Sequence, residues 1–156
     1  MSAVIESHHD DHHHGPAKGF SRWLYTTNHK DIGSLYLWFS FIMLFVGGAM
    51  AMVIRAELFE PGSQIVSPEF YNQMVTNHGL IMVFGVIMPA FVGLANWMIP
   101  MQIGAPDMAL PRLNNLSFWI LPAAFGVLLS TFLMEGGAPN FGWTFYAVSY
   151  THLTLP

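Results

Sequence analysis

The sequence contains no cysteine and few charged residues. Of its 156 residues, 5 are Lys or Arg and 9 are Asp or Glu, so that charged residues make up 9% of the chain. An average soluble domain carries about 25%. The lack of cysteine excludes disulfides, thiolate metal sites and cysteine nucleophiles. With a formal net charge of −4 there is no basic surface for nucleic acid, and no nucleic-acid partner is expected.

Apolar residues take the place of the missing charges. Hydrophobic residues account for 53% of the chain, and the ranges 32–54, 70–106 and 113–134 contain no charged residue. Each range is at least as long as the roughly 20 residues that cross a bilayer as a helix. One such range could be a buried helix of a soluble protein, but three among so few charges predict membrane spans. We expect an all-α membrane protein, a multi-span transmembrane helix bundle, with spans at about 32–54, 75–100 and 116–134.

The first residues have a different composition. Residues 1–24 are polar and rich in histidine, as in "SHHDDHHH", and they lack the apolar core and cleavage site of a signal peptide. We expect a disordered cytoplasmic tail. The histidines could bind a divalent metal loosely, but a solvated low-complexity leader is the favoured interpretation.

Basic residues predict the orientation of the spans. Lys18, Arg22 and Lys30 precede the first span and Arg112 follows the second, whereas Arg55 alone lies on the opposite side. Lys and Arg accumulate on the cytoplasmic side of membrane proteins. The N-terminus is therefore expected in the cytoplasm, with the first and third spans running outward.

A histidine at the start of the second span raises the first functional question. On spacing alone, His78 in "VTNHGLIMVFG" is more simply a brace that bonds a backbone carbonyl. As a ligand, one neutral ring nitrogen would hold an iron while the other donates to a second group. Arg55 ends the first span at a similar depth. It could extend to the interface, the commoner case, or donate hydrogen bonds to an anionic or carbonyl-bearing cofactor beside His78.

Polar residues also gather at the inner end of the second span. Asn96 lies 18 residues after His78, on the same face of a regular helix and about 27 Å deeper. Asp107 follows in the inner loop and Asn114 opens the third span. A carboxylate and amides at an aqueous mouth suit proton entry through ordered water. The simpler alternative, favoured on spacing alone, is a turn in which Asp107 pairs with Arg112.

The first outer loop offers oxygen ligands. Glu57, Gly62 and Gln64 supply a carboxylate, a backbone carbonyl and an amide oxygen, which suit Ca²⁺ or Na⁺. With a single carboxylate, spacing alone does not establish a cation site.

Four segments together resemble a known family. They are "TTNHKDIGSLYL", "IRAELFEPGSQ", "TNHGLIMVFGVIMPAFVGLANWMIPMQIGAPDMALPRLNNLSFW" and "GGAPNFGWTFYA". Read in order, they resemble subunit I of the heme-copper oxidases, of the cytochrome c oxidase type, over residues 25–147. The resemblance implies a bundle of twelve spans, of which this chain would hold the first three. It also implies heme a, heme a3 and copper, with Ca²⁺ or Na⁺ and Mg²⁺ as further ions.

The same resemblance implies an activity and a setting. Electrons from cytochrome c would pass through subunit II to heme a and then to the heme a3–copper centre, where O₂ is reduced to water while protons are pumped. Subunits II and III and membrane lipid would be its partners. The bacterial inner (plasma) membrane would be its location. Subunit I of a quinol oxidase, or a non-enzymatic proton or ion channel or transporter module, are the alternatives.

The resemblance also assigns roles to single residues. His78 is similar to an axial ligand of low-spin heme a, and Arg55 to the arginine that bonds the heme a formyl group. Tyr71 and Trp143 match aromatic positions near the propionates of heme a and heme a3. The remaining matches are Asp107, Asn96, Asn114 and Tyr36 for the proton path, and Glu57, Gly62 and Gln64 for the outer Ca²⁺ or Na⁺ site.

Other family ligands have no counterpart in this sequence. In the family, the second heme a ligand, the heme a3 ligand and the copper ligands lie in later spans, so that this fragment alone is expected to be inactive. His29 is expected to have a structural role near the interface. Residues 148–156, "VSYTHLTLP", depart from the family pattern and suggest a truncated or altered end, and no function is assigned to them.

Overall fold

The computed structural model describes residues 19–62, 65–142 and 144, and these ranges contain only helices and the loops between them. The helices are α1 (Phe20–Tyr25), α2 (His29–Glu57), α3 (Pro68–Leu80), the π-helix η1 (Ile81–Ile87), α4 (Met88–Ile103), α5 (Pro111–Ser130) and the 3₁₀ turn η2 (Thr131–Leu133). Gln64, Trp143, residues 1–18 and the predicted end at 148–156 lie outside the described residues.

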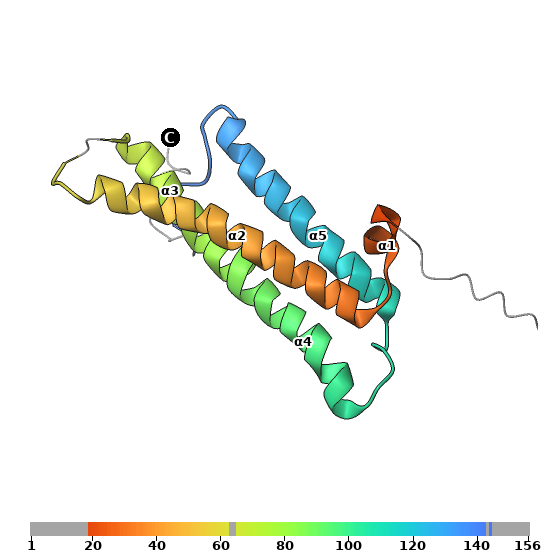
Figure 1. The fold of residues 1–156 in the computed structure, drawn as a ribbon. Coiled ribbons are helices and arrows are strands. Elements are labelled where there is room, and N and C mark those ends of the chain that lie inside the picture. The colour runs from red at the N-terminus through yellow and green to blue at the C-terminus, as the bar shows by residue number, and fades with distance from the viewer. Residues whose placement is uncertain (1–18, 63–64, 143, 145–156) are drawn as a thin grey trace, which may run out of the picture.

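Three long helical rods form a bundle, as Figure 1 shows. The segments His29–Glu57, Pro68–Ile103 and Pro111–Leu133 are long and apolar enough to cross a membrane, which confirms the predicted fold class. Helices α2 and α3 begin before the uncharged ranges, because a polar residue caps the first turn of each. The Asn28 side chain accepts a hydrogen bond from the Lys30 N–H, and Ser67 accepts one from the Phe70 N–H, which satisfies amide groups that the helix leaves unpaired.

Helix α2 is the centre of the bundle. It packs against α3, η1 and α4 on one side and against α5 on another, and α4 runs antiparallel to it (Figure 1). We call the end with Glu57 and Pro68 the outer end, and the end with His29 and Pro111 the inner end, after the predicted orientation. The shared core consists of Ile32, Tyr36, Phe39, Met43, Met50, Met74, Ile81, Phe118 and Phe125.

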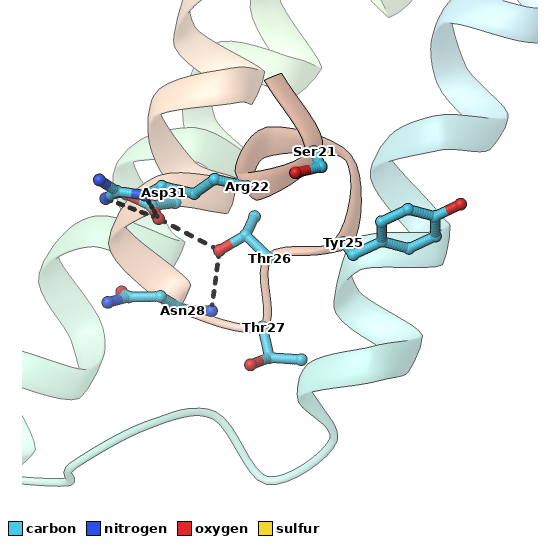
Figure 2. A pocket seen from close by; sticks show the side chains of 7 residues that line it. All are labelled: Ser21, Arg22, Tyr25, Thr26, Thr27, Asn28 and Asp31. Atoms are coloured by element: carbon cyan, nitrogen blue, oxygen red, sulfur yellow. Dashed lines mark hydrogen bonds and ion pairs between the residues drawn. The ribbon is translucent and has the colours of Figure 1, made fainter. Parts of the chain in front are cut away.

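A short helix precedes the first span, where the sequence predicted a disordered tail. Residues 20–24 belong to α1, and two contacts hold this helix at the inner end. The Trp119 Nε1–H donates to the Leu24 carbonyl at 3.1 Å. The Arg22 guanidinium bonds Asp31, with an Nη2–Oδ1 distance of 2.9 Å, and the Thr26 hydroxyl donates to the same carboxylate (Figure 2). The partners of both contacts lie in later helices, so the composition of the first residues could not reveal them.

The second span contains a π-helix, which changes its geometry. Pro89 stands near the start of α4 and has no N–H, so it cannot donate the regular hydrogen bond to the Gly85 carbonyl four residues earlier. The Met88 N–H instead donates to the Val83 carbonyl, five residues back, which is the π-type bond. The side-chain spacing of a regular α-helix therefore does not hold across residues 81–87.

Glycines allow the helices to approach closely. A Cβ atom added to Gly33 of α2 would lie 2.8 Å from the Gly93 carbonyl oxygen of α4, and one added to Gly47 would lie 2.8 Å from the Met82 Sδ. Small residues allow such close packing between membrane spans, and Gly47 does so. Gly48 does not, because nothing lies within 4 Å of the position of its Cβ.

The glycine contact yields a stability prediction. In the parent protein, Gly93→Ala should lower the free energy of unfolding by about 1–3 kcal/mol, because the new methyl group forces α4 away from α2. Gly126→Ala on α5 is the matched control, since nothing lies within 4 Å of its Cβ position. Denaturation of the detergent-solubilised protein measures both, and equal midpoints for the two variants would contradict the prediction.

Candidate functional site

The His78 ring is held by a backbone carbonyl of the neighbouring helix. Its Nδ1 atom lies 2.9 Å from the Gly47 carbonyl oxygen of α2. A carbonyl oxygen only accepts, so Nδ1 carries the proton and Nε2 of the neutral ring keeps its lone pair. This bond braces α2 against α3, which is the structural role considered for His78 from the sequence. It is also the contact that orients a metal-ligating histidine.

Arg55 and Tyr71 lie further towards the outer end. Arg55 is exposed in the last turn of α2, about 12 Å along the helix from Gly47. Tyr71 is half-buried on α3, seven residues before His78 and therefore on the same helix face, about 10 Å away. Because α2 and α3 run in opposite directions, both polar groups lie on the outer side of the Gly47–His78 contact, at similar depth.

These residues fit a metalloporphyrin. The imidazole offers one unprotonated nitrogen for a metal, and the guanidinium and phenol can serve the polar substituents of the macrocycle. The adjoining position Gly48 is open on its Cβ side, which leaves room for a flat group beside α2. Trp143, the fourth residue assigned to this region, lies outside the described residues.

A chain of hydrogen bonds connects four polar residues near the inner end. The Asn114 Nδ2–H donates to Asn96 Oδ1 at 2.6 Å, and the Asn96 Nδ2–H donates to the Val92 carbonyl at 2.9 Å. The Ser117 hydroxyl donates to the Asn114 carbonyl at 2.7 Å and lies 2.9 Å from the Tyr36 hydroxyl. The structure thus brings together three predicted residues, Asn96, Asn114 and Tyr36. The sequence analysis did not identify Ser117. Its spacing of three residues from Asn114 places both on one helix face and could have indicated it.

Asp107 bonds a histidine rather than the arginine considered from the sequence. Its Oδ1 atom lies 3.1 Å from His29 Nδ1 and accepts from the backbone N–H groups of His29, at 3.3 Å, and Met108, at 2.8 Å. The pairing with Arg112 was therefore wrong. His29 is buried, and its Nε2 has no hydrogen-bond partner among the described residues. The two residues stand 78 positions apart, so no local pattern could have paired them.

A cavity lies beside the two inner groups. It has a volume of about 380 Å³ and an apolar wall of Met108, Ala109, Leu110 and Leu113, with Asn114 and Ser117 as its polar residues. Within the described part of the chain, no hydrogen bond joins the Asp107–His29 pair directly to the Asn96–Asn114 pair. Because this hollow is open and mostly apolar, it offers few hydrogen-bond partners for ordered water between the two pairs.

His78 and Asn96 contact different helices. His78 bonds α2, whereas Asn96 accepts from Asn114 of α5. The expectation that both share one face assumed a regular α-helix, and the π-helix between them departs from that regularity.

Glu57 closes the first outer loop. The side chain is buried, and its Oε2 atom accepts from the Ile65 and Val66 N–H groups at 2.9 and 3.0 Å. Gly62 has a φ of +107°, a conformation that favours glycine. Gln64 lies outside the described residues. Among those that are described, no three His, Asp or Glu side chains gather as metal ligands, so that the observed role of Glu57 is to order the loop.

Comparison with known proteins identifies the family. The family model described as cytochrome C and quinol oxidase polypeptide I matches residues 31–155. Cytochrome c oxidase subunit 1 of Corynebacterium diphtheriae is 49% identical over 134 residues, covering 85% of this chain and 24% of that protein. The Corynebacterium glutamicum protein of the same name is 48% identical over 83% of this chain and 23% of its own length.

An archaeal relative extends the likeness. The heme-copper oxidase subunit I+III of Aeropyrum pernix is 48% identical over 86% of this chain and 17% of that protein. The chain thus spans a quarter or less of the length of these curated relatives. With a family match over most of its residues and three helices able to cross a membrane, the chain is a multi-pass membrane protein that belongs to the cytochrome c and quinol oxidase polypeptide I family.

Proposed function

We propose that this chain is the part of an oxidase subunit I that carries one axial ligand of heme a and the inner mouth of a proton path. In the complete subunit, electrons from cytochrome c pass through heme a to a heme a3–copper centre that reduces O₂ to water, coupled to proton pumping. The observation that carries the proposal is the His78 ring, fixed through Nδ1 on Gly47 in a chain of this family.

The complex around this chain follows from the same proposal. Subunit II receives the electrons, subunit III completes the assembly, and copper with Ca²⁺ or Na⁺ and Mg²⁺ complete the metal content. The bacterial plasma membrane is the location, with the N-terminus in the cytoplasm, as the distribution of Lys and Arg supports. The family also includes quinol oxidases, and oxidation of cytochrome c by the purified complex distinguishes the two donors.

At the outer end, the residues of this chain hold and tune the heme. Bound heme a supplies reversible one-electron transfer. His78 would offer Nε2 to the iron, and the Gly47 carbonyl accepts a hydrogen bond from Nδ1–H, which orients the ring and raises its basicity as a ligand. Arg55 would donate to the formyl group, and Tyr71 would serve the propionates. Glu57 orders the outer loop, and Glu57, Gly62 and Gln64 would supply oxygens for the cation.

At the inner end, the residues take up and guide protons. Asp107 binds a proton from the inner water phase at its carboxylate, which His29 and two backbone N–H groups hold in place. The Asn96 and Asn114 amides and the Tyr36 hydroxyl orient the water that carries the proton inward. Their mutual hydrogen bonds limit the rotation of these side chains, so the water-binding groups keep fixed directions.

The ligand role of His78 has a spectroscopic test. His78→Ala in the full-length oxidase should abolish the low-spin heme a band of the reduced enzyme, because the iron loses an axial ligand. Asn72→Ala, an exposed change on the same helix, should leave the band intact. A reduced spectrum of normal intensity in His78→Ala would refute the ligand role.

The proton-path role of Asp107 has a kinetic test. Asp107→Asn should slow turnover by about 10²-fold, at the lower end of what a positioned proton-transfer group contributes, and should stop pumping. Glu60→Gln, an exposed change in the outer loop, is the control. Proton release by reconstituted vesicles during cytochrome c oxidation measures both effects, and pumping at normal stoichiometry in Asp107→Asn would rule out the role.

The contact of Arg55 with the heme has its own test. Arg55→Met should shift the absorption maximum and the midpoint potential of heme a, because the formyl group loses a charged hydrogen-bond donor. Arg112→Met, which removes a guanidinium at the inner end, should change neither. If the Arg55→Met spectrum and potential match those of the Arg112→Met variant, Arg55 does not bond the formyl group.

A further inference from the structure

Three consecutive residues tie the last full turn of α3 to two different parts of the molecule. His78 bonds the Gly47 carbonyl of α2. On the other side, Thr76 Oγ1 accepts from the Gly142 N–H at 3.0 Å, and the Asn77 Nδ2–H donates to the Pro139 carbonyl at 3.3 Å. The turn that carries His78 is thus held between α2 and the segment that follows η2, residues 136–142.

The two residues on this other side are deeply buried. Thr76 is 2% exposed and Asn77 is fully buried. Asn77 Nδ2 also donates to the Gln73 carbonyl at 2.8 Å, while its Oδ1 has no partner among the described residues. A buried amide with an unsatisfied oxygen is unfavourable compared with an apolar side chain of similar volume. General packing of the segment therefore does not account for an asparagine here, whereas a directional bond to Pro139 does.

The 136–142 segment is shaped to lie against this face of α3. Gly136, Gly137 and Gly142 have φ values of +92°, +74° and +82°, a region that side chains rarely adopt. A Cβ atom on Gly137 would overlap the side-chain amide of Gln73. The segment can therefore reach Thr76 and Asn77 only because glycine occupies the point of closest approach.

The backbone around His78 needs this support. The Ile81 N–H is shared between the Asn77 and His78 carbonyls, and Ile81 begins the π-helix. At such a junction the regular pairing four residues apart is replaced by other spacings, so the hydrogen-bond ladder defines the turn less firmly than in a uniform α-helix. The bonds of Thr76 and Asn77 supply external restraints at this junction.

We propose that Thr76 and Asn77 are positioning residues that clamp the 136–142 segment onto α3 and so fix the orientation of the His78 ring. The inference rests on the proposed function, in which His78 ligates heme a. Loosening the clamp lets the turn shift and weakens the bond from His78 Nδ1 to Gly47. A weaker bond lowers the basicity of the imidazole, which stabilises the oxidised iron less and raises the midpoint potential.

A matched pair of variants in the full-length oxidase tests the clamp. Thr76→Val removes the oxygen that accepts from Gly142, and Thr76→Ser keeps it. Hydrogen exchange at the Gly142 amide should be roughly fivefold faster in Thr76→Val, the ratio for loss of one net hydrogen bond, and unchanged in Thr76→Ser. The midpoint potential of the low-spin heme should rise in Thr76→Val and stay at the wild-type value in Thr76→Ser.

Two further variants approach the clamp from its other parts. Asn77→Ala removes the bond to Pro139, and Gly137→Ala pushes the segment away through its clash with the Gln73 side chain, without replacing a residue of α3. Both should speed exchange at Gly142 and raise the potential in the same direction as Thr76→Val. If either variant fails to assemble, the Thr76 pair still decides the question, because its changes are nearly isosteric.

The outcomes separate this inference from the function on which it rests. Unchanged exchange in Thr76→Val would overturn the clamp. Faster exchange with an unaltered heme spectrum and potential would overturn the positioning role while leaving the ligand role of His78 intact. A normal low-spin band in His78→Ala would overturn the ligand role, and with it the positioning role.

Discussion

Hydrogen bonds from polar side chains to the backbone of neighbouring helices define how the spans of this protein fit together. In a bilayer no water is available to a buried polar group, so each must find a partner within the protein. His78 bonds Gly47, and the Ser40 hydroxyl donates to the Val86 carbonyl at 2.8 Å. Both bonds join α2 to the second span. Apolar contacts alone would allow these helices to slide or rotate, whereas directional bonds fix their register.

The same constraint explains the separation of the two candidate regions. The outer region, around His78, is fixed on α2, and the inner region, around Asn96, is fixed on α5. The π-helix stands between them and changes the direction in which the second span presents its side chains. One span can thereby offer an imidazole to one neighbour and an amide to another. Regular α-helical spacing would have directed both towards the same helix face.

Much of the fold follows from short-range features of the sequence. The lengths of the uncharged ranges predict three spans, since a bilayer demands helices of about 20 apolar residues. The polar residues inside those spans, His78 and Asn96, were identified because such groups are costly in lipid unless they have a role. Helix α1 was missed because its stability depends on Asp31 and on Trp119, which is distant in the chain.

The candidate site was predicted in part, for a similar reason. The residue types at the inner end were recognised, but the partner of Asp107 was not, because His29 lies at the start of another helix. The link from Asn114 to Tyr36 through Ser117 likewise crosses from α5 to α2. Spacing along one helix predicts which side chains share a face. It carries no information on which residue of another helix stands opposite.

The sequence by itself determined the membrane-spanning character of the chain, the three spans of its described part and the identity of the polar residues within them. These properties depend on hydrophobicity and length, which are local. Only the tertiary structure decided which of those residues meet, that His78 bonds through Nδ1 and that Asp107 bonds His29. These contacts require α2 and α4 to approach closely at Gly33 and Gly93, which happens only when the helices pack together.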